Sequence, residues 1–367
     1  MKNKIKVGII FGGKSAEHEI SLLSAKNVAE AIDQDKYEVV LIAIDKNGKW
    51  FLGDSSKLFL NSDDPKLIKL NNAASQSMAL VPQSEGKIIN LDTCQSDKFI
   101  DVAFPILHGP FGEDGTIQGL LKLANIPFVG ASVLGSAVGM DKDVAKRLLR
   151  DAEIPIAKFL MAKESSTPTY EEVVKNLGVP FFVKPANLGS SVGVSKVKDE
   201  KDFAKAVQEA FVYDRKIIIE ENISGREIEC SVLGNDDPIA SLPGEVVCKH
   251  DFYSYEAKYI DEYGAALEIP AKLPPELVKK IQALAVKTFK TLACEGMGRV
   301  DFFLKKNGDV LVNEINTIPG FTSISMYPKL WEASGISYTE LIDRLIQLAL
   351  ERFEKEQKLK TSYEKEN

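Results

Sequence analysis

Hydrophobic and polar positions in the first part of the chain predict a strand, a helix and a second strand. Residues 6–11 and 37–44 are short, almost continuous apolar runs, as expected for buried strands. Residues 15–31, between them, carry apolar side chains at the spacing of an amphipathic helix. We therefore expect a βαβ unit. Residues 46–98 are polar and irregular, and are interpreted as short edge strands of the same unit.

The same patterns predict elements along the rest of the chain. Further strands are expected at residues 101–107, 126–129, 181–185, 192–197, 216–220, 227–233, 240–247, 298–304 and 309–315. Helices are expected at residues 116–123, 141–152, 170–177, 201–211, 275–293 and 338–353, together with a small-residue helix within residues 123–140. The charge-rich end of the chain, from Glu351 onward, should fray into solvent.

Chain length indicates more than one domain. At about 150 residues per domain, 367 residues give about two to three domains, and a hydrophobic share of 44% is enough for each to have a core. The pattern divides the chain at residues 1–130, 131–222 and 223–367. The first unit should be α/β with an open parallel sheet, the second a small α+β unit, and the third a unit of strands with two helices.

Charge and composition exclude several classes of protein. The net charge of -7 argues against nucleic acid or an anionic membrane as the main partner. Four cysteines without a C-x-x-C pattern predict buried thiols in a reduced compartment. With three histidines and no H-E-x-x-H motif, any metal must use oxygen ligands. No segment resembles a signal peptide or a membrane-spanning helix, so we expect a cytoplasmic protein.

One motif is misleading. Residues 8–15 match the phosphate-binding pattern G-x-x-x-x-G-K-[ST], yet Gly8 falls inside the predicted strand and residues 9–11 are bulky apolar side chains that favour burial. We interpret residues 12–13 as the turn from strand to helix. Glu17 then lies at the carboxyl end of a parallel strand, where open α/β sheets bind ligands. The alternative is that Glu17 is a helix N-terminal acid that complements the helix dipole.

Two other glycine-rich segments are candidate ligand-binding loops. Residues 108–115 follow a buried strand and combine glycines with His108 and two acids, although an ordinary β-to-α connection would look similar. Residues 184–193 join two strands, so they form a hairpin tip whose backbone N–H groups can cover phosphates. Lys184 stands in an apolar strand and is costly to bury unless an anion meets it. The alternative is a solvent-facing lysine beside the hairpin.

A cluster of polar side chains is predicted on two later strands. Arg299 and Asp301 share one face of a strand, Glu314 and Asn316 share one face of the next, and a turn at residues 305–309 joins the two strands. Oxygen donors without histidine fit magnesium shared with substrate phosphates. Arg299 can stabilise charge that develops on a phosphoryl group or an oxyanion. A salt-bridge ladder on a wet face is the alternative.

Two segments near this cluster are expected to serve the same site. Residues 316–325 continue from it as a loop that offers backbone donors and hydroxyls to an oxyanion or a substrate carboxylate. Residues 249–263 are rich in aromatic side chains and acids. A stacking platform for nucleic acid would need basic surroundings, so we interpret this segment as a lid that closes over the active site.

Together these motifs resemble those of the D-alanine:D-alanine ligase family, which has the ATP-grasp fold. The resemblance covers about residues 6–350. The motifs that carry it are, in chain order, residues 12–21 (GGKSAEHEIS), 108–115 (HGPFGEDG), 140–142 (MDK), 184–185 (KP), 189–193 (GSSVG), 255–259 (YEAKY), 298–301 (GRVD) and 313–323 (NEINTIPGFTS). The fold implied is mixed α/β and α+β, an ATP-grasp core preceded by an N-terminal domain with an open parallel sheet.

The resemblance implies an activity. ATP would phosphorylate the carboxylate of one D-alanine, and the amine of a second D-alanine would attack the D-alanyl phosphate, giving D-alanyl-D-alanine, ADP and phosphate for peptidoglycan synthesis and cell shape. The implied cofactors are ATP as co-substrate and two Mg²⁺ ions, replaceable by Mn²⁺. The implied protein is a cytoplasmic homodimer that binds D-alanine and ATP, with no nucleic-acid or membrane partner.

The resemblance also implies roles for individual residues. A catalytic set around the first D-alanine and the oxyanion would comprise Glu17, Ser190, Tyr259, Arg299 and Gly320. Substrate binding would involve His108, Ser325 and Met326. ATP binding would involve Lys142, Lys184, Glu220, Glu221, Glu227 and Lys258. The metal ligands would be Asp301, Glu314 and Asn316.

Two positions bear on how far the resemblance extends. Glu221 stands where many family members have a lysine near the adenine, so its role is left open. Tyr259 matches the type specific for D-alanine, whereas the depsipeptide-forming relatives from vancomycin resistance lack it, and we expect dipeptide synthesis. The alternatives are another ATP-grasp carboxylate–amine ligase, a bicarbonate-dependent enzyme like biotin carboxylase, or a nucleotide-binding regulatory protein without turnover.

Overall fold

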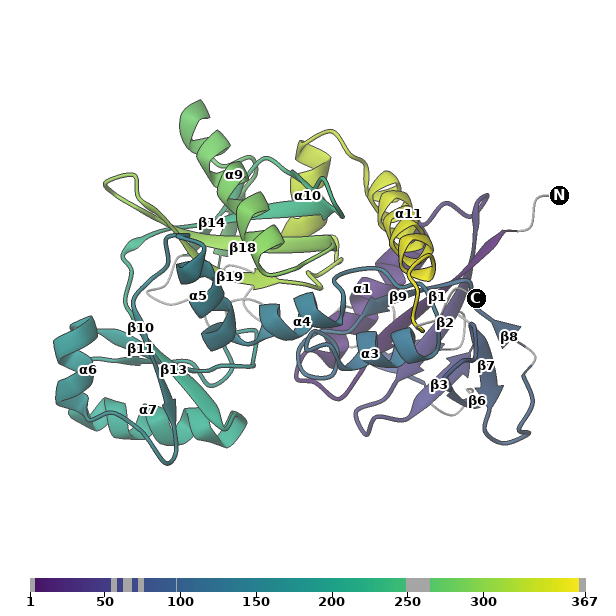
Figure 1. The fold of residues 1–367 in the computed structure, drawn as a ribbon, viewed down its shortest axis with the longest axis horizontal. Coiled ribbons are helices and arrows are strands. Elements are labelled where there is room, and N and C mark those ends of the chain that lie inside the picture. The colour runs from purple at the N-terminus through teal and green to yellow at the C-terminus, as the bar shows by residue number, and fades with distance from the viewer. Residues whose placement is uncertain are drawn as a thin grey trace, which may run out of the picture.

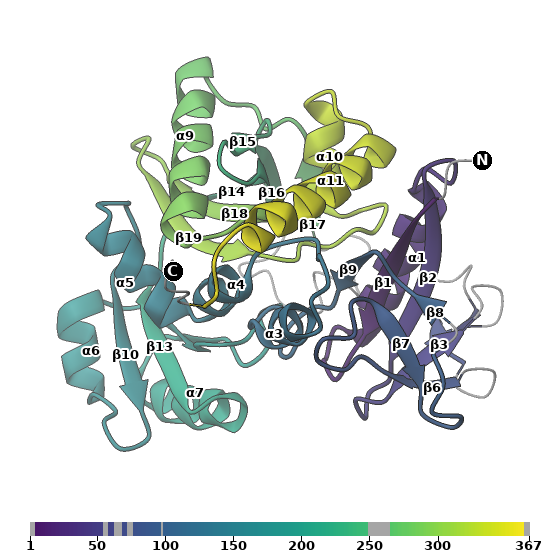
Figure 2. The same ribbon diagram turned by 45° about the vertical axis from the view of Figure 1, so that its right-hand side comes forward.

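The fold is built on three large β-sheets, seen in two views in Figure 1 and Figure 2. The computed structural model describes residues 4–53, 58–61, 68–71, 76–96, 98–248 and 265–362. Within these ranges the sheets have seven, four and six strands, and a separate two-stranded sheet pairs β4 (Phe59–Leu60) with β5 (Lys69–Leu70).

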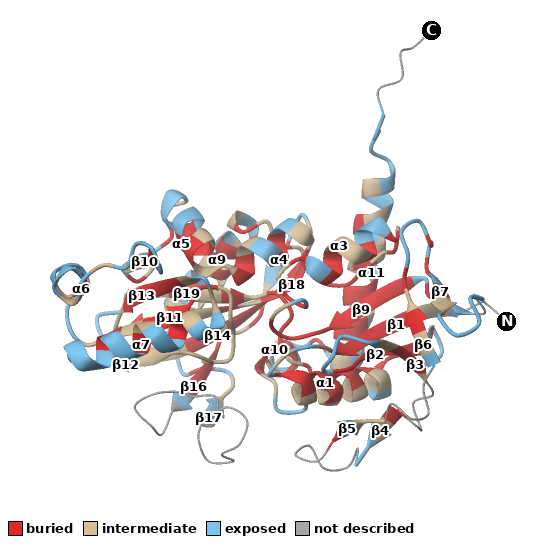
Figure 3. Ribbon diagram, turned by 90° about the horizontal axis from the view of Figure 1, so that it is seen from below, coloured by how far each residue is buried: buried red, intermediate tan, exposed pale blue. Residues whose placement is uncertain are grey.

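The first sheet is parallel at one end of its strand order and antiparallel toward the other. Its strand order is β8-β7-β6-β3-β2-β1-β9, and β1 pairs in parallel with both β2 and β9. Its strands are β1 (Ile5–Gly12), β2 (Tyr37–Ile44), β3 (Trp50–Gly53), β6 (Gln76–Ala79), β7 (Lys87–Asn90), β8 (Lys98–Phe99) and β9 (Val102–Ile106). Helices α1 (His18–Ala31) and α3 (Thr116–Leu123) follow β1 and β9. The predicted βαβ opening is therefore confirmed, and β1 and β9 are mostly buried (Figure 3).

The second sheet is small and antiparallel, in the order β10-β13-β11-β12. Its strands are β10 (Phe159–Lys163), β11 (Phe181–Pro185), β12 (Ser195–Val197) and β13 (Lys216–Glu221). Helices α6 (Tyr170–Leu177) and α7 (Glu200–Tyr213) lie beside it in Figure 1. Val183 pairs with Ser195, so residues 186–194 form the hairpin tip that the sequence predicted.

The third sheet carries the later strands and is also antiparallel, in the order β17-β16-β14-β18-β19 with β15 paired to β14. Its strands are β14 (Gly225–Gly234), β15 (Ile239–Ala240), β16 (Gly244–Cys248), β17 (Ala265–Glu268), β18 (Gly296–Lys305) and β19 (Val310–Asn316). The helices of this part are α9 (Pro275–Thr291), α10 (Met326–Ala333) and α11 (Tyr338–Gln357).

Several predicted elements differ from those observed, and proline explains two of the differences. Residues 126–129 make only an isolated bridge between Phe128 and Ala103, because Pro127 has no N–H with which to extend a ladder. The strand predicted at residues 240–247 is divided into β15 and β16, with Pro243 between them. Strand β10 and helix α10 were not predicted.

The cysteines only partly match the prediction. Cys230 and Cys294 are buried free thiols, as expected, and burial raises the pKa of each to about 12. Cys94 is exposed, so the expectation that all the thiols are buried was wrong for this residue, which lies in a turn after β7. Among the helices within the described ranges, none combines the length and apolar character that crossing a bilayer requires.

The hydrophobic cores do not follow chain order. One core joins the first sheet to α10 and α11, since Phe11 and Phe104 share a cluster with Trp331 and Leu345. A second core contains side chains from α5 (Lys142–Asp151) and from β14, β18 and β19 of the third sheet. The second sheet has a core of its own within residues 162–219. The division at residues 130 and 222 stays a prediction, but elements from opposite ends of the chain share cores.

Helix α11 continues past Glu351 to Gln357, so the predicted fraying from Glu351 was wrong for this turn. Arg352 is the reason, since this residue is only 7% exposed. Its Nη1 donates to the carbonyl of Gly130 at 2.6 Å, and its Nη2 donates to the carbonyl of Phe128 at 2.7 Å. The guanidinium also lies 4.5 Å from the centre of the Phe128 ring. A buried cation with these acceptors holds the helix end in place.

Replacing Arg352 with leucine should lower the free energy of unfolding by about 3 kcal/mol, because two buried carbonyl groups lose charged donors. Urea unfolding followed by tryptophan fluorescence measures this. Arg344→Leu is the matched control on the same helix, since Arg344 is exposed and pairs with Glu340 on the same helix. It should change stability by about 0.5 kcal/mol or less. Equal losses in the two variants would contradict the role given to Arg352.

Candidate active site

The turn after β1 places Glu17 at the edge of the first sheet. Gly12 and Gly13 have φ of +90° and +93°, and a Cβ on Gly12 would lie 2.2 Å from the carbonyl oxygen of Ile44. Glycine is therefore required at this turn. Gly8 lies inside β1, as predicted. Glu17 is the residue before α1, where it makes no side-chain hydrogen bond that caps the helix. The alternative, an acid that complements the dipole of α1, needs no such bond and stays open.

Glu17 instead contacts the hairpin tip of the second sheet. The hydroxyl of Ser190 donates to Oε1 of Glu17, across 173 positions of sequence. Ser190 and Ser191 both have positive φ, of 53° and 59°, so the tip is tightly turned at this contact. The structure thus brings together two of the three residues of the predicted Glu17, Ser190 and Tyr259 set. Tyr259 lies outside the described residues, as do Lys258 and the predicted lid at residues 249–263.

The loop after β9 faces the loop after β19. Nδ1 of His108 lies 3.1 Å from the carbonyl oxygen of Ile318, and since a carbonyl can only accept, Nδ1 carries the proton. Glu113 joins the same two loops, because its carboxyl group accepts from the N–H of Gly109 at 2.6 Å and from the N–H of Ile318 at 3.4 Å. Residues far apart in sequence are thereby held side by side.

Burial shifts the pKa of both titratable groups in this loop. Burial, with a smaller contribution from the neighbouring Glu17 carboxylate, raises the pKa of Glu113 to about 8. Burial also lowers the pKa of His108 below 6.5, against the opposing effect of Glu17. The imidazole is therefore neutral at pH 7. Its Nε2 is buried and has no hydrogen-bond partner within the described part of the chain, so it presents a lone pair.

Two lysines meet one carboxylate beneath the hairpin tip. Lys184 on β11 is 9% exposed, and its Nζ lies 2.6 Å from Oε2 of Glu220 on β13. Glu220 is therefore the anion that the burial of Lys184 requires. Oε1 of the same carboxylate is paired with Lys146 of α5. Burial opposes the charge on Lys184, but Glu220 and Glu314 outweigh it and raise the pKa of Lys184. Burial also opposes charge on Glu220, whose pKa the two lysines lower.

Lys142, at the start of α5, connects the hairpin tip to the third sheet. Its Nζ donates to the carbonyl oxygen of Leu188 at 2.9 Å and lies 3.1 Å from Oε2 of Glu314. The helix is fixed at this end by Asp141, whose side chain accepts from the N–H groups of Asp143 and Val144. Lys142 therefore touches both the predicted phosphate-covering segment and one of the predicted metal ligands.

The predicted cluster on β18 and β19 is present. The antiparallel register places Arg299 opposite Asn316 and Asp301 opposite Glu314. Nε and Nη2 of Arg299 donate to the two carboxylate oxygens of Asp301 at 2.7 and 2.8 Å, and Nδ2 of Asn316 donates to Asp301 at 3.0 Å. Burial opposes the charge on Arg299, but Asp301 and Glu229 raise its pKa well above the ordinary value.

The donor chemistry of this cluster fits magnesium. Within the part of the chain that the structure describes, no three His, Cys, Asp or Glu side chains gather so that they could hold a metal by themselves. Asp301 and Glu314 supply two carboxylates, and Asn316 adds an amide oxygen on the same hairpin. Mg²⁺ is usually bound by one or two carboxylates and completes its shell with water and substrate phosphates. The set is therefore sufficient for that ion.

The loop after β19 leads into the N-terminus of α10. Ser325 is the residue before this helix, and its hydroxyl lies 2.8 Å from that of Thr322. A Cβ on Gly320 would lie 2.7 Å from the hydroxyl oxygen of Ser325, so the two residues are close neighbours. The side chain of Met326 is buried against Val246 and Leu330. Any contact of Met326 with a substrate must therefore be made by its backbone N–H.

Two predicted ATP-binding residues stand apart from these contacts. Glu221 accepts a hydrogen bond from the N–H of Lys158 at 2.7 Å, which ties β13 to the start of β10. Glu227 lies on β14 between β16 and β18 and is half-buried. Their contact with a nucleotide stays a prediction.

The sequence reasoning missed three charged residues of the site, Glu113, Lys146 and Glu229. Lys146 follows Lys142 by one helical turn, a spacing that places both on one face of a helix. Glu229 follows Glu227 by two positions on β14, and its Oε2 lies 2.8 Å from Nε of Arg299. Glu113 was only noted as one of two acids in its loop. Helical and strand periodicity could have found Lys146 and Glu229, but not their partners.

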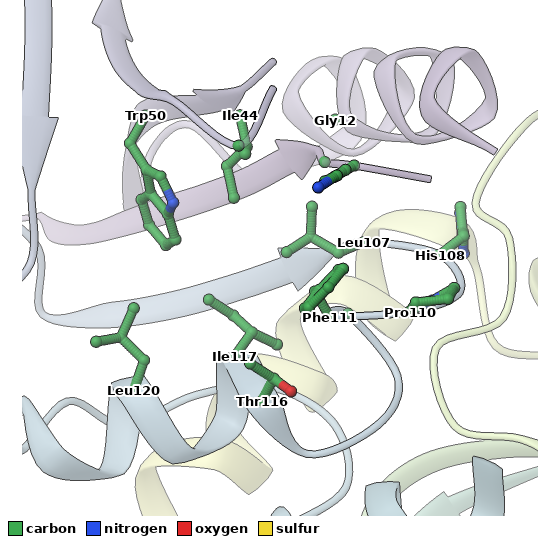
Figure 4. A pocket seen from close by; sticks show the side chains of 14 residues that line it. Gly12, Ile44, Trp50, Leu107, His108, Pro110, Phe111, Thr116, Ile117 and Leu120 are labelled. Carbon is green, nitrogen blue, oxygen red and sulfur yellow. The ribbon is translucent and has the colours of Figure 1, made fainter. Parts of the chain in front are cut away.

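An apolar cavity of about 390 Å³ lies beside the site, on the first sheet (Figure 4). Trp50, Leu107, Phe111 and Ile117 line it, and His108 lies at one side. Of the residues predicted to bind substrate or perform catalysis, His108 alone lines this cavity within the described chain. The cavity is therefore adjacent to the charged site and distinct from it.

Comparison with solved structures defines the class of protein. A D-alanine-D-alanine ligase from Coxiella burnetii aligns with a TM-score of 0.86 and 42% identity, covering 97% of this chain and 96% of that one. VanG, a D-Ala:D-Ser ligase from Enterococcus faecalis, aligns with a TM-score of 0.83 and 35% identity, covering 95% and 100%. The fold is that of the ATP-grasp ligases, as predicted.

Sequence comparison then identifies the family. Residues 6–131 match the profile of the D-ala D-ala ligase N-terminus, and residues 148–347 match that of the D-ala D-ala ligase C-terminus. D-alanine--D-alanine ligase from Oceanobacillus iheyensis is 55% identical, covering 98% of this chain and 99% of the relative. D-alanine--D-alanine ligase A from Escherichia coli shows the same identity and coverage. The chain belongs to the D-alanine–D-alanine ligase family.

Glu113 should give the protein a measurable pH dependence. Because its pKa is raised from 4.5 to about 8, the folded protein retains a proton that the unfolded chain releases, and stability falls as pH rises between these values. We expect Glu113→Gln to lose more stability at pH 5.5 than at pH 8, by about 1 kcal/mol or more. Urea unfolding at both pH values measures this. Glu354→Gln, an exposed control, should show no trend, and a larger loss for Glu113→Gln at pH 8 would contradict the assignment.

Proposed function

We propose that the protein joins two D-alanine molecules at the expense of ATP. The γ-phosphoryl group of ATP passes to a carboxylate oxygen of the first D-alanine, giving D-alanyl phosphate and ADP. The amine of the second D-alanine attacks the acyl carbon and loses a proton, and phosphate leaves as D-alanyl-D-alanine forms. The product is a precursor of peptidoglycan.

The contact of Lys142 with Glu314 carries this proposal, in a chain 55% identical to D-alanine--D-alanine ligases. Lys142 joins the phosphate-covering hairpin to the carboxylate of Glu314 on β19. A phosphoryl group bound between them would contact both the lysines and the metal ion, as phosphoryl transfer requires. A regulatory protein that binds nucleotide without turnover would have no need of Arg299 beside this pair.

The first D-alanine is proposed to lie among Glu17, Ser190 and His108. The Glu17 carboxylate, which accepts a hydrogen bond from the Ser190 hydroxyl, is proposed to accept hydrogen bonds from the substrate ammonium group. The lone pair on Nε2 of neutral His108 accepts a second N–H, since the proton of this imidazole is engaged by the Ile318 carbonyl. From the family resemblance, Tyr259 completes this set.

ATP is proposed to lie between the hairpin tip and α5. Lys142 and Lys184 supply positive charge to its phosphates, with Lys258 from the segment outside the described residues. Glu220 and Glu227 contact the adenosine part. Charge neutralisation and alignment are the main requirements of phosphoryl transfer, and both lysines are held in fixed positions by carboxylates.

Asp301, Glu314 and Asn316 are proposed to hold two Mg²⁺ ions, or Mn²⁺ in their place. The bound metal supplies positive charge that offsets the charge of the ATP phosphates. Arg299 and the N–H of Gly320 are proposed to stabilise the oxyanion formed when the second amine attacks. The Ser325 hydroxyl and the backbone N–H of Met326, at the N-terminus of α10, are proposed to donate hydrogen bonds to the carboxylate of the second D-alanine.

We further propose that the enzyme is a homodimer in the cytoplasm, where ATP is available. The family resemblance is the basis for both statements. Sedimentation equilibrium of the full chain tests the first, and fractionation of the source cells tests the second.

The second substrate should be D-alanine. With ATP and D-alanine alone, ADP release at pH 7 should be rapid and D-alanyl-D-alanine the product. An equimolar mixture with D-lactate or D-serine should still give mainly D-alanyl-D-alanine, because Tyr259 matches the dipeptide-forming type. Product analysis by mass spectrometry measures this, with L-alanine as the negative control. A predominance of the mixed product would overturn the specificity, and ADP release without any dipeptide would overturn the reaction.

Arg299→Ala should lower kcat by about 10² or more while ATP still binds, as expected for the loss of an oxyanion donor. Steady-state kinetics and calorimetric titration of ATP measure the two effects. Arg344→Ala, which removes an exposed arginine, should leave both unchanged. Turnover retained in a folded Arg299→Ala protein would remove this residue from the proposed role.

A further inference from the structure

Lys146 is the most deeply buried cation beneath the hairpin tip, among the site residues that the structure describes. Its side chain is 1% exposed, whereas that of Lys184 is 11% exposed. It lies on α5, one turn after Lys142, and is paired with Oε1 of Glu220. The motifs that identify the family do not include it, and the reaction described above gives it no task.

Glu220 is shared between two cations. Its Oε1 faces Lys146 on α5, and its Oε2 lies 2.6 Å from Lys184 on β11. The carboxylate thus bridges a helix packed on the third sheet and a strand of the second sheet. Because Glu220 sits on β13 opposite Phe182 and Phe159, backbone pairing on both sides fixes the point from which its side chain extends.

Stability alone does not account for a lysine at this position. Removing an ammonium group from water is costly, and a buried ion pair is often no better for stability than apolar side chains of similar volume. Ala145 and Leu149, the neighbours of Lys146 on α5, already pack in the core of the third sheet. The side chain of Lys146 is instead directed at Glu220 of the second sheet, so its charge serves that carboxylate and not the core.

We propose that Lys146 is a positioning residue for the nucleotide and that it acts through Glu220. By neutralising one oxygen of this carboxylate, Lys146 keeps Glu220 ionised and fixed, and prevents it from turning both oxygens onto Lys184. The ammonium group of Lys184 then retains N–H donors for a phosphate, while Glu220 stays in place for the adenosine part. This inference rests on the proposed function, since it assumes that Lys184 and Glu220 bind ATP.

The first test is Lys146→Met, which keeps the length of the side chain and removes its charge. We expect the dissociation constant of MgATP, measured by titration calorimetry on the full chain, to rise at least about tenfold, as for the loss of a charge-assisted contact. KM for ATP should rise more than kcat falls, and KM for D-alanine should stay unchanged. Arg150→Met is the matched control, because it removes a charge from the exposed side of the same helix. An unchanged affinity in folded Lys146→Met protein would overturn the proposal.

The second test separates action through Glu220 from direct contact with the nucleotide. In a Glu220→Gln background the carboxylate is absent, so adding Lys146→Met should change the affinity for MgATP by less than about twofold. A loss as large as in the unaltered background would show that Lys146 acts by another route and would overturn the proposal. Should Lys146→Met fail to fold, Lys146→Gln keeps a hydrogen-bond donor for Glu220 without the charge, and the same comparison applies.

Measurements on the unaltered enzyme separate a failure of the proposed function from a failure of the role proposed for Lys146. If it neither binds MgATP nor releases ADP with D-alanine, the proposed function fails and this inference fails with it. If it does both, and the effects of the substitutions at positions 146 and 220 are simply additive, the inference alone fails.

Discussion

The pairing of β18 with β19 fixes the geometry on which the site depends. One register places Arg299 opposite Asn316, so that the guanidinium and the amide both donate to Asp301, and places Glu314 opposite Asp301. The other charged groups are arranged around this hairpin, because Lys142 approaches Glu314 from α5 and Glu229 approaches Arg299 from β14. A slip of one residue would turn each of these side chains to the opposite face of the sheet.

Compensation of buried charge is the second constraint. Lys184, Lys146 and Arg299 are all removed from solvent, and each has a carboxylate from a different element as its partner. Since an unpaired buried charge is strongly destabilising, these pairs require the second sheet, the third sheet and α5 to be in place. The contact of Lys142 with Glu314 lies between the charges around Glu220 and those around Arg299. A substitution in one group can therefore alter the electrostatic environment of the other.

Local patterns in the sequence predicted most of the elements and much of the site. Alternation on two strands was enough to place Arg299 and Asp301 beside Glu314 and Asn316, because strand periodicity and a short turn decide that geometry. The anion that meets Lys184 could be required from the sequence but not identified, since Glu220 becomes its neighbour only through the order of strands in the second sheet.

The residues and the helix end that the sequence did not predict also depend on contacts between distant parts of the chain. Lys146 and Glu229 have clear periodic relations to Lys142 and Glu227, but their partners lie on elements that only the tertiary fold brings close. The end of α11 was predicted to fray because its sequence is charged. Arg352 is buried there and donates hydrogen bonds to two carbonyl groups more than 200 positions away in sequence. No local sequence pattern indicates these contacts.

The sharing of one core by the first sheet and α11 has a consequence for biosynthesis. The side chains of Leu341, Leu345 and Ala349 complete a cluster that begins with Val7 and Ile9. A ribosome releases the first sheet and α1, which packs on this face through Leu22, Ala25 and Val28, before it makes α11, so the part of the core that α11 contributes is missing until residues 338–357 emerge. The native packing of the first sheet is therefore completed late in synthesis, when α11 has joined α1 on this core.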